Sequence, residues 1–583
     1  MDEMPEIRDV PYTRMTGEQK VAKIIPAQFS LEGLNPEERY VLRLISQAVN
    51  YMTPIFAHQQ NEGTLSMFHA IQALETTVTD PSQRGALDDF LTLLALRNSP
   101  WDMEGIGHRF PIPQEQIPDG HPVLSFTHLL FEDTRAPPGR NLYPADITAK
   151  EFEALGEDGN VVNSSVVRLP SGKLRVELNE KRYRREVLPA ITSLRAALHE
   201  TSHPKLKGYL EAKIHELMTG TKEAQRESDL AWLENDSPID FVIGTGIETY
   251  LDKFKGKRGA AMGAVFVRDD RYATLTQRML GLLPQWEATT PWKHRKEVDP
   301  TKLPRLSFVN VANWTGFYYL FPAVVAAESL PNDKEVVDQY GSVNMNFSNV
   351  QQALHRGGGA SYLVEEFFPR AERGRLDEIT RMYPLMTALH ELGHTTGGSL
   401  LADDPHSFFG EEYSRFEEAR AELFSMWALR SLRTEGIITD SEMRSGDYSM
   451  LVSIISALQM APEDHNGSRN MMFHYFLEKG AVVPLEEDGK VKYAIDPERM
   501  MPAIESMLQA VADMKAEGNR EGFAAFKEQY VSDAQRGLFK ERLAGMPLGR
   551  GLIFPRQIGS VISSGLNYPS TFLEQKSTLG HFR

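Results

Sequence analysis

The chain is too long to fold around a single hydrophobic core. It has 583 residues, whereas one core stops growing at about 250–300 residues, so two or more lobes are expected. Apolar residues recur at helical spacing over Leu31–Leu96 and again over Gln351–Leu543. Between Pro111 and Arg271, prolines and glycines separate strand-like runs such as Met262–Val267 and a predicted hairpin over Val166–Leu178. We predict an α+β fold with two lobes around a cleft, one mixed α/β and one mainly helical.

The predicted boundaries follow this change in pattern. Residues 1–270 are expected to form the mixed α/β lobe with a helical N-terminal segment, completed by about 310–350 and 546–583. Residues 351–545 are expected to form the mainly helical lobe, which carries the chemical motifs described below. The last forty or so residues are rich in Gly, Pro and Ser, which is typical of an irregular tail.

Composition excludes several classes of function. The net charge of -17, from 63 basic and 80 acidic residues, disfavours nucleic acid as a partner because a phosphate backbone would be repelled. The absence of cysteine excludes thiolate ligands and a cysteine nucleophile, so a transition metal would need His and carboxylate ligands. No run of about 18 apolar residues occurs, and the first residues do not have the apolar segment typical of a signal peptide. We therefore expect a cytoplasmic protein, with a processed exported form left open and the oligomeric state unknown.

One segment has the pattern of a metal-binding helix. A predicted start at Pro384 and a stop at Gly397 bound a helix that contains a His-Glu-x-x-His motif. His390 and His394 lie one helical turn apart on one face, so both imidazoles can bind one metal ion. Glu391 lies about 100° round the helix and can accept a proton from a metal-bound water. Taken alone, the motif is also compatible with two histidines on a solvated helix face.

A second acidic helix follows the first motif. Within Glu417–Glu422, Glu418 can serve as a third protein ligand and leave the fourth zinc position to water, as catalytic zinc requires. Glu417 and Glu422 are then candidates to accept the free ring N–H of a liganding histidine. The alternative is a solvated acidic helix face. We predict one zinc ion per chain, bound by His390, His394 and Glu418.

Together, the two motifs resemble the dipeptidyl peptidase III family of zinc metallopeptidases, specifically its shorter variant with histidines four residues apart. Further segments occur in the family's order, so the resemblance covers roughly residues 30–540: Tyr143–Asp146, Ile247–Tyr250, Leu330–Asp333 and Asp464–Arg469. The resemblance implies zinc-dependent peptide hydrolysis with Glu391 as the general base. It also implies that His465 and Arg469 line the cleft and stabilise the reacting carbonyl.

The resemblance identifies substrate-binding candidates as well. The family anchors the amino terminus of its substrate partly with an asparagine at the position of Ser329, and a second asparagine is present here as Asn332. A tyrosine and an amine-binding acid of better-known members fall near Phe241–Gly244, where this chain has neither. Asp240 and Glu248 are the nearby acidic candidates. Two hypotheses follow: amino-terminal recognition is weakened or rebuilt, or Asp240 and Asn332 still bind the amine.

The predicted activity is that of a zinc metallopeptidase, a hydrolase that resembles a dipeptidyl peptidase or aminopeptidase. Its expected partner is a peptide or amide substrate. One alternative keeps zinc hydrolysis but changes the substrate to a blocked peptide or another amide. Another alternative is a non-catalytic interaction protein on the same scaffold. The presence of Glu391 argues against this last reading, because metal binding alone does not need a general base.

Overall fold

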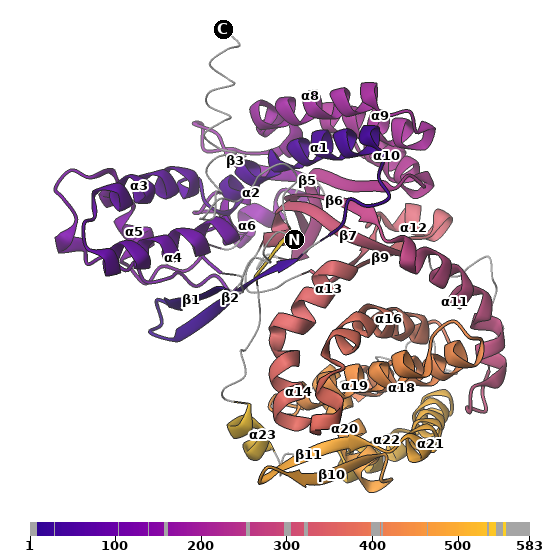
Figure 1. Cartoon of the computed structure of the whole chain (residues 1–583). Coiled ribbons are helices and arrows are strands. Elements are labelled where there is room, and N and C mark those ends of the chain that lie inside the picture. The colour runs from indigo at the N-terminus through magenta and orange to yellow at the C-terminus, as the bar shows by residue number, and fades with distance from the viewer. Residues whose placement is uncertain are drawn as a thin grey trace. The chain divides into compact units, whose positions relative to one another are not determined.

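The computed structural model describes the chain from residue 8 to residue 555 with several gaps. The gaps are residues 28, 103, 138, 157–160, 252–256, 296–304, 320–324, 398–408, 410–411, 463, 533–535 and 544–551. The chain divides into two units (Figure 1). Unit 1 comprises Met1–Arg268, Val309–Ser342 and Arg550–Arg583, and unit 2 comprises Asp269–Phe308 and Val343–Gly549.

The largest sheet among the described residues has five strands in the order β5-β6-β7-β9-β8. Their bounds are Ile239–Leu251 (β5), Lys257–Arg268 (β6), Arg305–Gly316 (β7), Ala327–Leu330 (β8) and Val343–Phe347 (β9). Strand β6 pairs antiparallel with both β5 and β7. The register of β5 against β6 shifts between Gly244 and Glu248, which is the signature of a bulge that bends the strand.

Helices of unit 1 cover the β5–β6 pair. Helices α1 (Pro36–Asn50) and α2 (Met52–Gln60) pack against it. Helix α8 packs against α1, α9 packs against α8, and α10 packs against α9 (Figure 1). The bounds of these last three are Arg184–Glu200, Pro204–Thr219 and Lys222–Glu234. A β-carbon added to Gly263 of β6 would lie 2.7 Å from Cβ of Val49. Glycine at this position therefore lets α1 approach the sheet closely.

Smaller elements complete unit 1. Helices α3 (Thr64–Thr77) and α4 (Pro81–Arg97) share an apolar cluster near the N-terminus. Strands β1 (Arg8–Thr13) and β2 (Gln19–Ala27) pair antiparallel, and β12 (Leu552–Pro555) joins β2 in parallel. The last of these pairings ties the C-terminal part of the chain to its beginning.

Unit 2 is mainly helical and is built on one continuous apolar core. Its main helices are α11 (Asp270–Thr289), α13 (Ser348–His355), α14 (Ser361–Phe367), α16 (Leu376–His394), α18 (Glu412–Thr434), α19 (Asp440–Ala457), α20 (Asp464–Glu478), α21 (Pro497–Ala516), α22 (Arg520–Tyr530) and α23 (Arg536–Arg542). A two-stranded ribbon of β10 (Val482–Glu487) and β11 (Lys490–Ile495) accompanies them. Helix α18 contacts α16, α19, α20 and α21, so it is the central helix of this unit.

The predicted α+β fold class is confirmed by this combination of a helical unit and mixed helix and sheet. The predicted hairpin is also confirmed, as β3 (Ser164–Arg168) and β4 (Leu174–Leu178). The predicted helix start at Pro384 is wrong, because α16 begins at Leu376 and contains Pro384 in its interior. A proline removes one backbone hydrogen bond from a helix interior, and the apolar packing of α16 in the core compensates for that loss.

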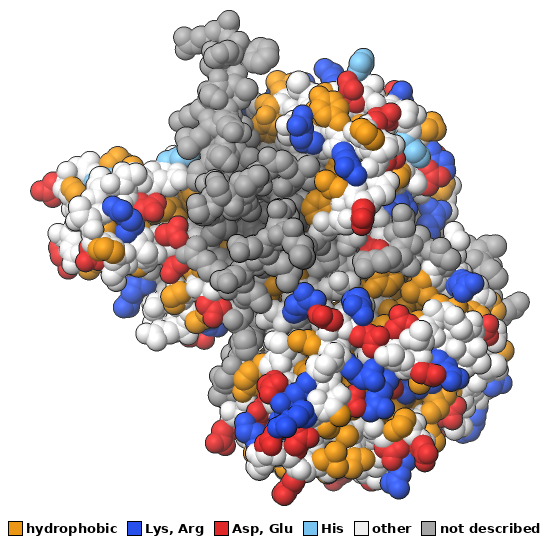
Figure 2. Space-filling view, viewed as in Figure 1, with side chains coloured by type: hydrophobic (Ala, Val, Ile, Leu, Met, Phe, Trp, Pro, Cys, Tyr) orange, Lys and Arg blue, Asp and Glu red, His pale blue; other side chains and the backbone are white. Residues whose placement is uncertain are grey.

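The visible surface carries both signs of charge. Figure 2 shows basic and acidic side chains interspersed over the described part of this face, with apolar side chains in small groups between them. None of the described helices combines the length and the apolar character that a membrane span requires.

Candidate metal centre

Two helices of unit 2 bring the predicted zinc ligands together. Helix α16 carries His390 and His394 at its C-terminal end, and α18 carries Glu418 in its second turn. Gly393 lies at the crossing of the two helices: an added β-carbon would lie 3.0 Å from Cα of Ala421 and 3.1 Å from its carbonyl oxygen. Both histidines and the glutamate therefore depend on a close helix packing that glycine permits.

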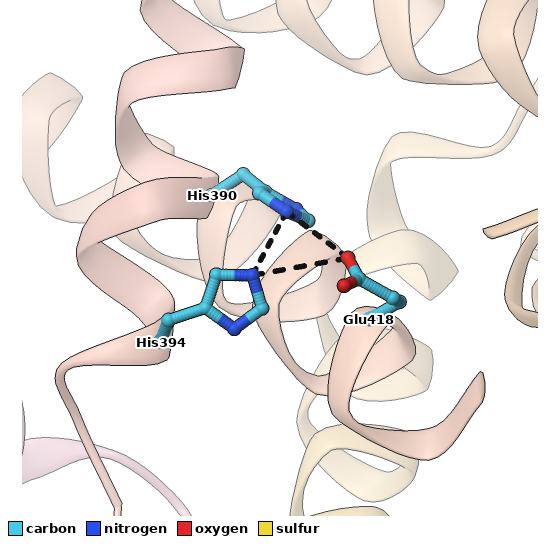
Figure 3. Close-up of side chains that lie close together, drawn as sticks. All are labelled: His390, His394 and Glu418. Atoms are coloured by element: carbon cyan, nitrogen blue, oxygen red, sulfur yellow. Dashed lines mark hydrogen bonds and ion pairs between the residues drawn. The ribbon is translucent and has the colours of Figure 1, made fainter. Parts of the chain in front are cut away.

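The three side chains converge on one point (Figure 3). Nε2 of His390 lies 3.1 Å from Nε2 of His394 and 3.2 Å from Oε2 of Glu418. Nε2 of His394 lies 3.8 Å from the same carboxylate oxygen. The side chains are 13%, 29% and 17% exposed for His390, His394 and Glu418, so a ligand can still reach the site.

The donor set fits a zinc ion. Ligand atoms about 2.0–2.2 Å from a tetrahedral zinc lie roughly 3.3–3.6 Å from one another, and the three observed separations of 3.1, 3.2 and 3.8 Å span that value. Two imidazole nitrogens and one carboxylate oxygen are also the ligands of a catalytic rather than a structural zinc site. A fourth position remains for water or substrate.

Acidic neighbours surround His390. Burial by itself would lower the pKa of His390, but the carboxylates of Glu418, Glu422 and Glu391 outweigh it and raise that pKa. The same negative field favours a bound cation. Glu391 follows His390 directly and is partly exposed, as a residue that exchanges protons with a bound water must be.

Glu417 holds His394 in place. Its Oε1 lies 3.0 Å from Nδ1 of His394, a contact that fixes the proton on Nδ1 and leaves Nε2 to face the metal. Two cations share the same carboxylate: Arg420 donates from Nε at 3.0 Å and Lys515 of α21 donates at 2.8 Å. Burial would raise the pKa of Glu417, but Arg420, His394 and Lys515 hold it well below the usual range. Glu417 is therefore a firmly ionised acceptor.

Glu422 connects the site to α20. Its carboxylate accepts hydrogen bonds from Nε of Arg469 at 2.8 Å and from Oγ of Ser468 at 3.2 Å. The structure thus brings together two residues that the sequence singled out separately. His465 also lies in α20, but its side chain is outside the described residues.

Three residues of this network had no role in the sequence analysis. Arg420 lies inside the second motif, where its charge was visible but its buried pairing with Glu417 was not. Glu287 of α11 accepts from the backbone N–H of Gly397 at 2.8 Å and so fixes the chain that leaves α16. Lys515 and Glu287 belong to distant helices, and no local pattern marks either residue.

The substrate-binding candidates lie in unit 1. Asn332 is exposed and donates to the carbonyl of Ile247 at 3.3 Å, whereas the exposed Ser329 lies 3.4 Å from the hydroxyl of Ser342. Asp240 is only 4% exposed. Its carboxylate accepts from Trp232 Nε1 at 2.9 Å, the Phe241 N–H at 2.8 Å and Asn235 Nδ2 at 3.3 Å. Glu248 belongs to β5, and its side chain lies outside the described residues.

Comparison with known proteins identifies the family that this chain resembles. Peptidase family M49 matches residues 154–414, a range that includes His390, Glu391 and His394 and ends three residues before Glu417. The chain resembles the structure of dipeptidyl peptidase III from Caldithrix abyssi, with a TM-score of 0.74 and 20% identity over 91% of this chain and 98% of that one. The resemblance to the dipeptidyl peptidase III family is confirmed. The match supports a peptidase.

Two further proteins are similar over most of the chain. Dipeptidyl-peptidase III from Corallococcus sp. strain EGB has a TM-score of 0.61 and 21% identity, covering 95% of this chain and 96% of that one. Nudix hydrolase 3 from Arabidopsis thaliana is 25% identical over 563 residues, which is 87% of this chain and 69% of that protein. The two structural likenesses bear on the fold, and the name of the plant protein describes that protein alone.

Proposed function

We propose that the chain is a zinc-dependent peptidase that cleaves peptide bonds with a metal-activated water and releases dipeptides from the amino terminus of its substrate. The observation that carries the proposal is the triangle of donor atoms from His390, His394 and Glu418, all within 4.8 Å of one another, directly beside Glu391. The match to a peptidase family supports the same reaction.

Different residues of the chain have different roles in the proposed reaction. A bound zinc would lower the pKa of a coordinated water to about 7 and polarise the substrate carbonyl. Glu391 accepts the proton of the attacking water and passes it to the departing amine. Arg469, held by Glu422 at 2.8 Å, presents its guanidinium group to the charge that develops on the carbonyl oxygen. His465 is proposed for the same task on the basis of the family resemblance.

Metal analysis and a peptide screen test the proposal together. Purified protein is assayed for zinc and then incubated with a peptide library in which each member has a free or an acetylated amino terminus, with products read by mass spectrometry. One zinc per chain and release of amino-terminal dipeptides support the proposal. Zinc with hydrolysis of blocked substrates alone supports the amidohydrolase alternative. Absence of both zinc and hydrolysis supports a non-catalytic interaction protein.

A further inference from the structure

Helix α16 has one polar face beside the metal ligands. Over the last thirteen residues of this helix, the side chains that stay partly exposed are those of Tyr383, Thr387, His390, Glu391 and His394. Seven residues correspond to almost two full helical turns, so the side chain of Tyr383 points in nearly the same direction as that of His390. Tyr383 therefore lies on the face that carries the proposed zinc ligands, although no sequence motif marks it.

A buried histidine holds the ring of Tyr383. His355, the last residue of α13, is 8% exposed and stacks on this ring, with centroids 4.6 Å apart and planes inclined by 27°. Both ring nitrogens of His355 are buried and have no hydrogen-bond partner among the described residues. Its contact with Tyr383 is therefore made through the flat face of the ring, which restricts the directions in which the phenol can turn.

The hydroxyl of Tyr383 is available to a ligand. Within the described residues it makes no hydrogen bond, and it is not one of the polar atoms that the protein encloses. The neighbouring hydroxyl differs, because Thr387 donates to the carbonyl oxygen of Tyr383 at 3.1 Å. A phenol that is held in place and unpaired can donate a hydrogen bond to a bound molecule.

A cationic group of α20 lies near this hydroxyl. Arg469 donates from Nε to Glu422 at 2.8 Å, and its side chain is 27% exposed. Partial burial would lower the pKa of Arg469, but the neighbouring Glu422, Tyr383 and Glu418 raise it. The structure thus holds two donors, one neutral and one charged, near each other and near the metal ligands.

The position of Tyr383 along α16 limits what it can contact. Seven helical residues rise about 10.5 Å, so Tyr383 is too far from His390 to reach the carbonyl group that reacts at the metal. An extended peptide advances about 3.3 Å per residue, so it must continue for about three residues beyond the reacting carbonyl to meet Tyr383. Release of dipeptides leaves two residues on the amino side of the cleaved bond. The contact must therefore be made on the carboxyl side.

We propose that the hydroxyl of Tyr383 binds a backbone carbonyl group about three residues beyond the cleaved bond, and that His355 positions its ring. The inference rests on the proposed peptidase function and adds a subsite to it. A peptide with two residues on each side of the cleaved bond is too short to make this contact. Because the hydroxyl binds the backbone, the subsite selects for peptide length rather than for a particular side chain.

Two peptides of different length test the subsite. A tetrapeptide and a hexapeptide that share their first four residues are compared on the wild type and on Tyr383→Phe, which keeps the ring and removes the hydroxyl. A neutral hydrogen bond corresponds to roughly a 2- to 10-fold effect, so kcat/KM for the hexapeptide should fall by that factor while the tetrapeptide value stays unchanged. Tyr272→Phe is the matched control, because the hydroxyl of Tyr272 also lies against α16 but already donates to the carbonyl oxygen of Arg381 at 3.2 Å. It should change neither value.

Variants of His355 test its role as a positioning residue. His355→Phe keeps an aromatic ring beside Tyr383 and should leave both kcat/KM values unchanged. His355→Ala removes the stacking partner and should lower the hexapeptide value alone. A general weakening of the fold would lower both values, so the dependence on peptide length separates positioning from structural support.

A binding measurement separates the inference from the reaction. In a Glu391→Gln background, calorimetry with the same two peptides should show that Tyr383→Phe weakens the hexapeptide by roughly 2- to 10-fold and leaves the tetrapeptide unchanged. If the wild type hydrolyses neither peptide, the proposed function fails while this measurement still decides the inference. An equal loss for both peptides, no loss for the hexapeptide, or a lower zinc content in Tyr383→Phe would overturn the assignment.

Discussion

Replacing Gly393 with alanine tests whether the helix crossing sets the metal site. The added β-carbon would lie 3.0 Å from Cα of Ala421, 3.1 Å from its carbonyl oxygen and 3.2 Å from Cδ1 of Phe424. Ordinary van der Waals contact begins at about 3.4 Å. Two of these three atoms belong to the backbone, which cannot turn aside as a flexible side chain can. Helices α16 and α18 must therefore move apart by a few tenths of an ångström.

Two opposing contributions determine how Gly393→Ala changes the free energy of unfolding. Overpacking of this kind costs about 1–3 kcal/mol, and replacing glycine with alanine inside a helix returns about 1 kcal/mol. We expect a net destabilisation of about 0–2 kcal/mol. The effect on zinc should be clearer, since metal sites tolerate only about 0.2 Å of error in ligand distance and Glu418 would move relative to both histidines. We expect zinc affinity to fall by about 10–100-fold, which is the loss that typically follows mutation of a residue that supports a metal ligand.

The assay is a zinc titration against a competing chelator, with a thermal unfolding curve of the zinc-free protein beside it. Gly281→Ala in α11 is the matched control, because an added β-carbon there meets nothing within 4 Å. This control should be as stable as the wild type or slightly more stable, with unchanged zinc affinity. Gly393→Ala with wild-type zinc affinity would refute the idea that the close crossing positions Glu418.

Four further outcomes are expected. His390→Ala should lower the zinc content from about one per chain to near zero, measured by elemental analysis. Glu391→Gln should keep its zinc and lose most of its turnover, because an amide cannot accept the proton of water. Glu417→Gln should weaken zinc binding by about 10–100-fold. It should also lower the free energy of unfolding, measured by chemical denaturation, by about 3–5 kcal/mol, because the buried Arg420 loses the carboxylate with which it pairs. Burial raises the pKa of Asp229 from its ordinary value of 3.8 to about 7. Between about pH 4 and pH 7 the folded state therefore keeps a proton that the unfolded chain releases, so the free energy of unfolding falls as the pH rises through this range. Asp229→Asn should remove this fall and be more stable than the wild type above pH 7 by up to about 4 kcal/mol.

Much of the candidate metal centre could be predicted because its residues lie in two short helical motifs. A spacing of four residues places His390 and His394 on one face whatever the rest of the chain does. Glu418 could be proposed as the third ligand from chain order and residue type alone. The start of α16 could not be placed in the same way, because proline inside a helix is tolerated only where tertiary packing compensates for the lost hydrogen bond.

The supporting network could not be predicted, since it depends on contacts between distant helices. Lys515 reaches Glu417 across 98 residues, and Glu287 reaches the end of α16 across 110. Each is an ordinary charged residue in its own sequence context. A charged residue on an amphipathic helix is usually solvated, and only the packing of α11 and α21 against the core reveals that these two hold parts of the metal site.

The two aspartates of unit 1 illustrate the same limit for substrate recognition. Sequence proximity to Phe241–Gly244 favours Asp240, whose Oδ1 accepts hydrogen bonds from three donors of its own surroundings. Asp229 is one element earlier in the chain and has no motif around it, but it borders a small cavity that Asn332 also lines. Which carboxylate oxygens lack a donor among the described residues therefore depends on packing between elements, and the position of an acid in the sequence does not indicate it.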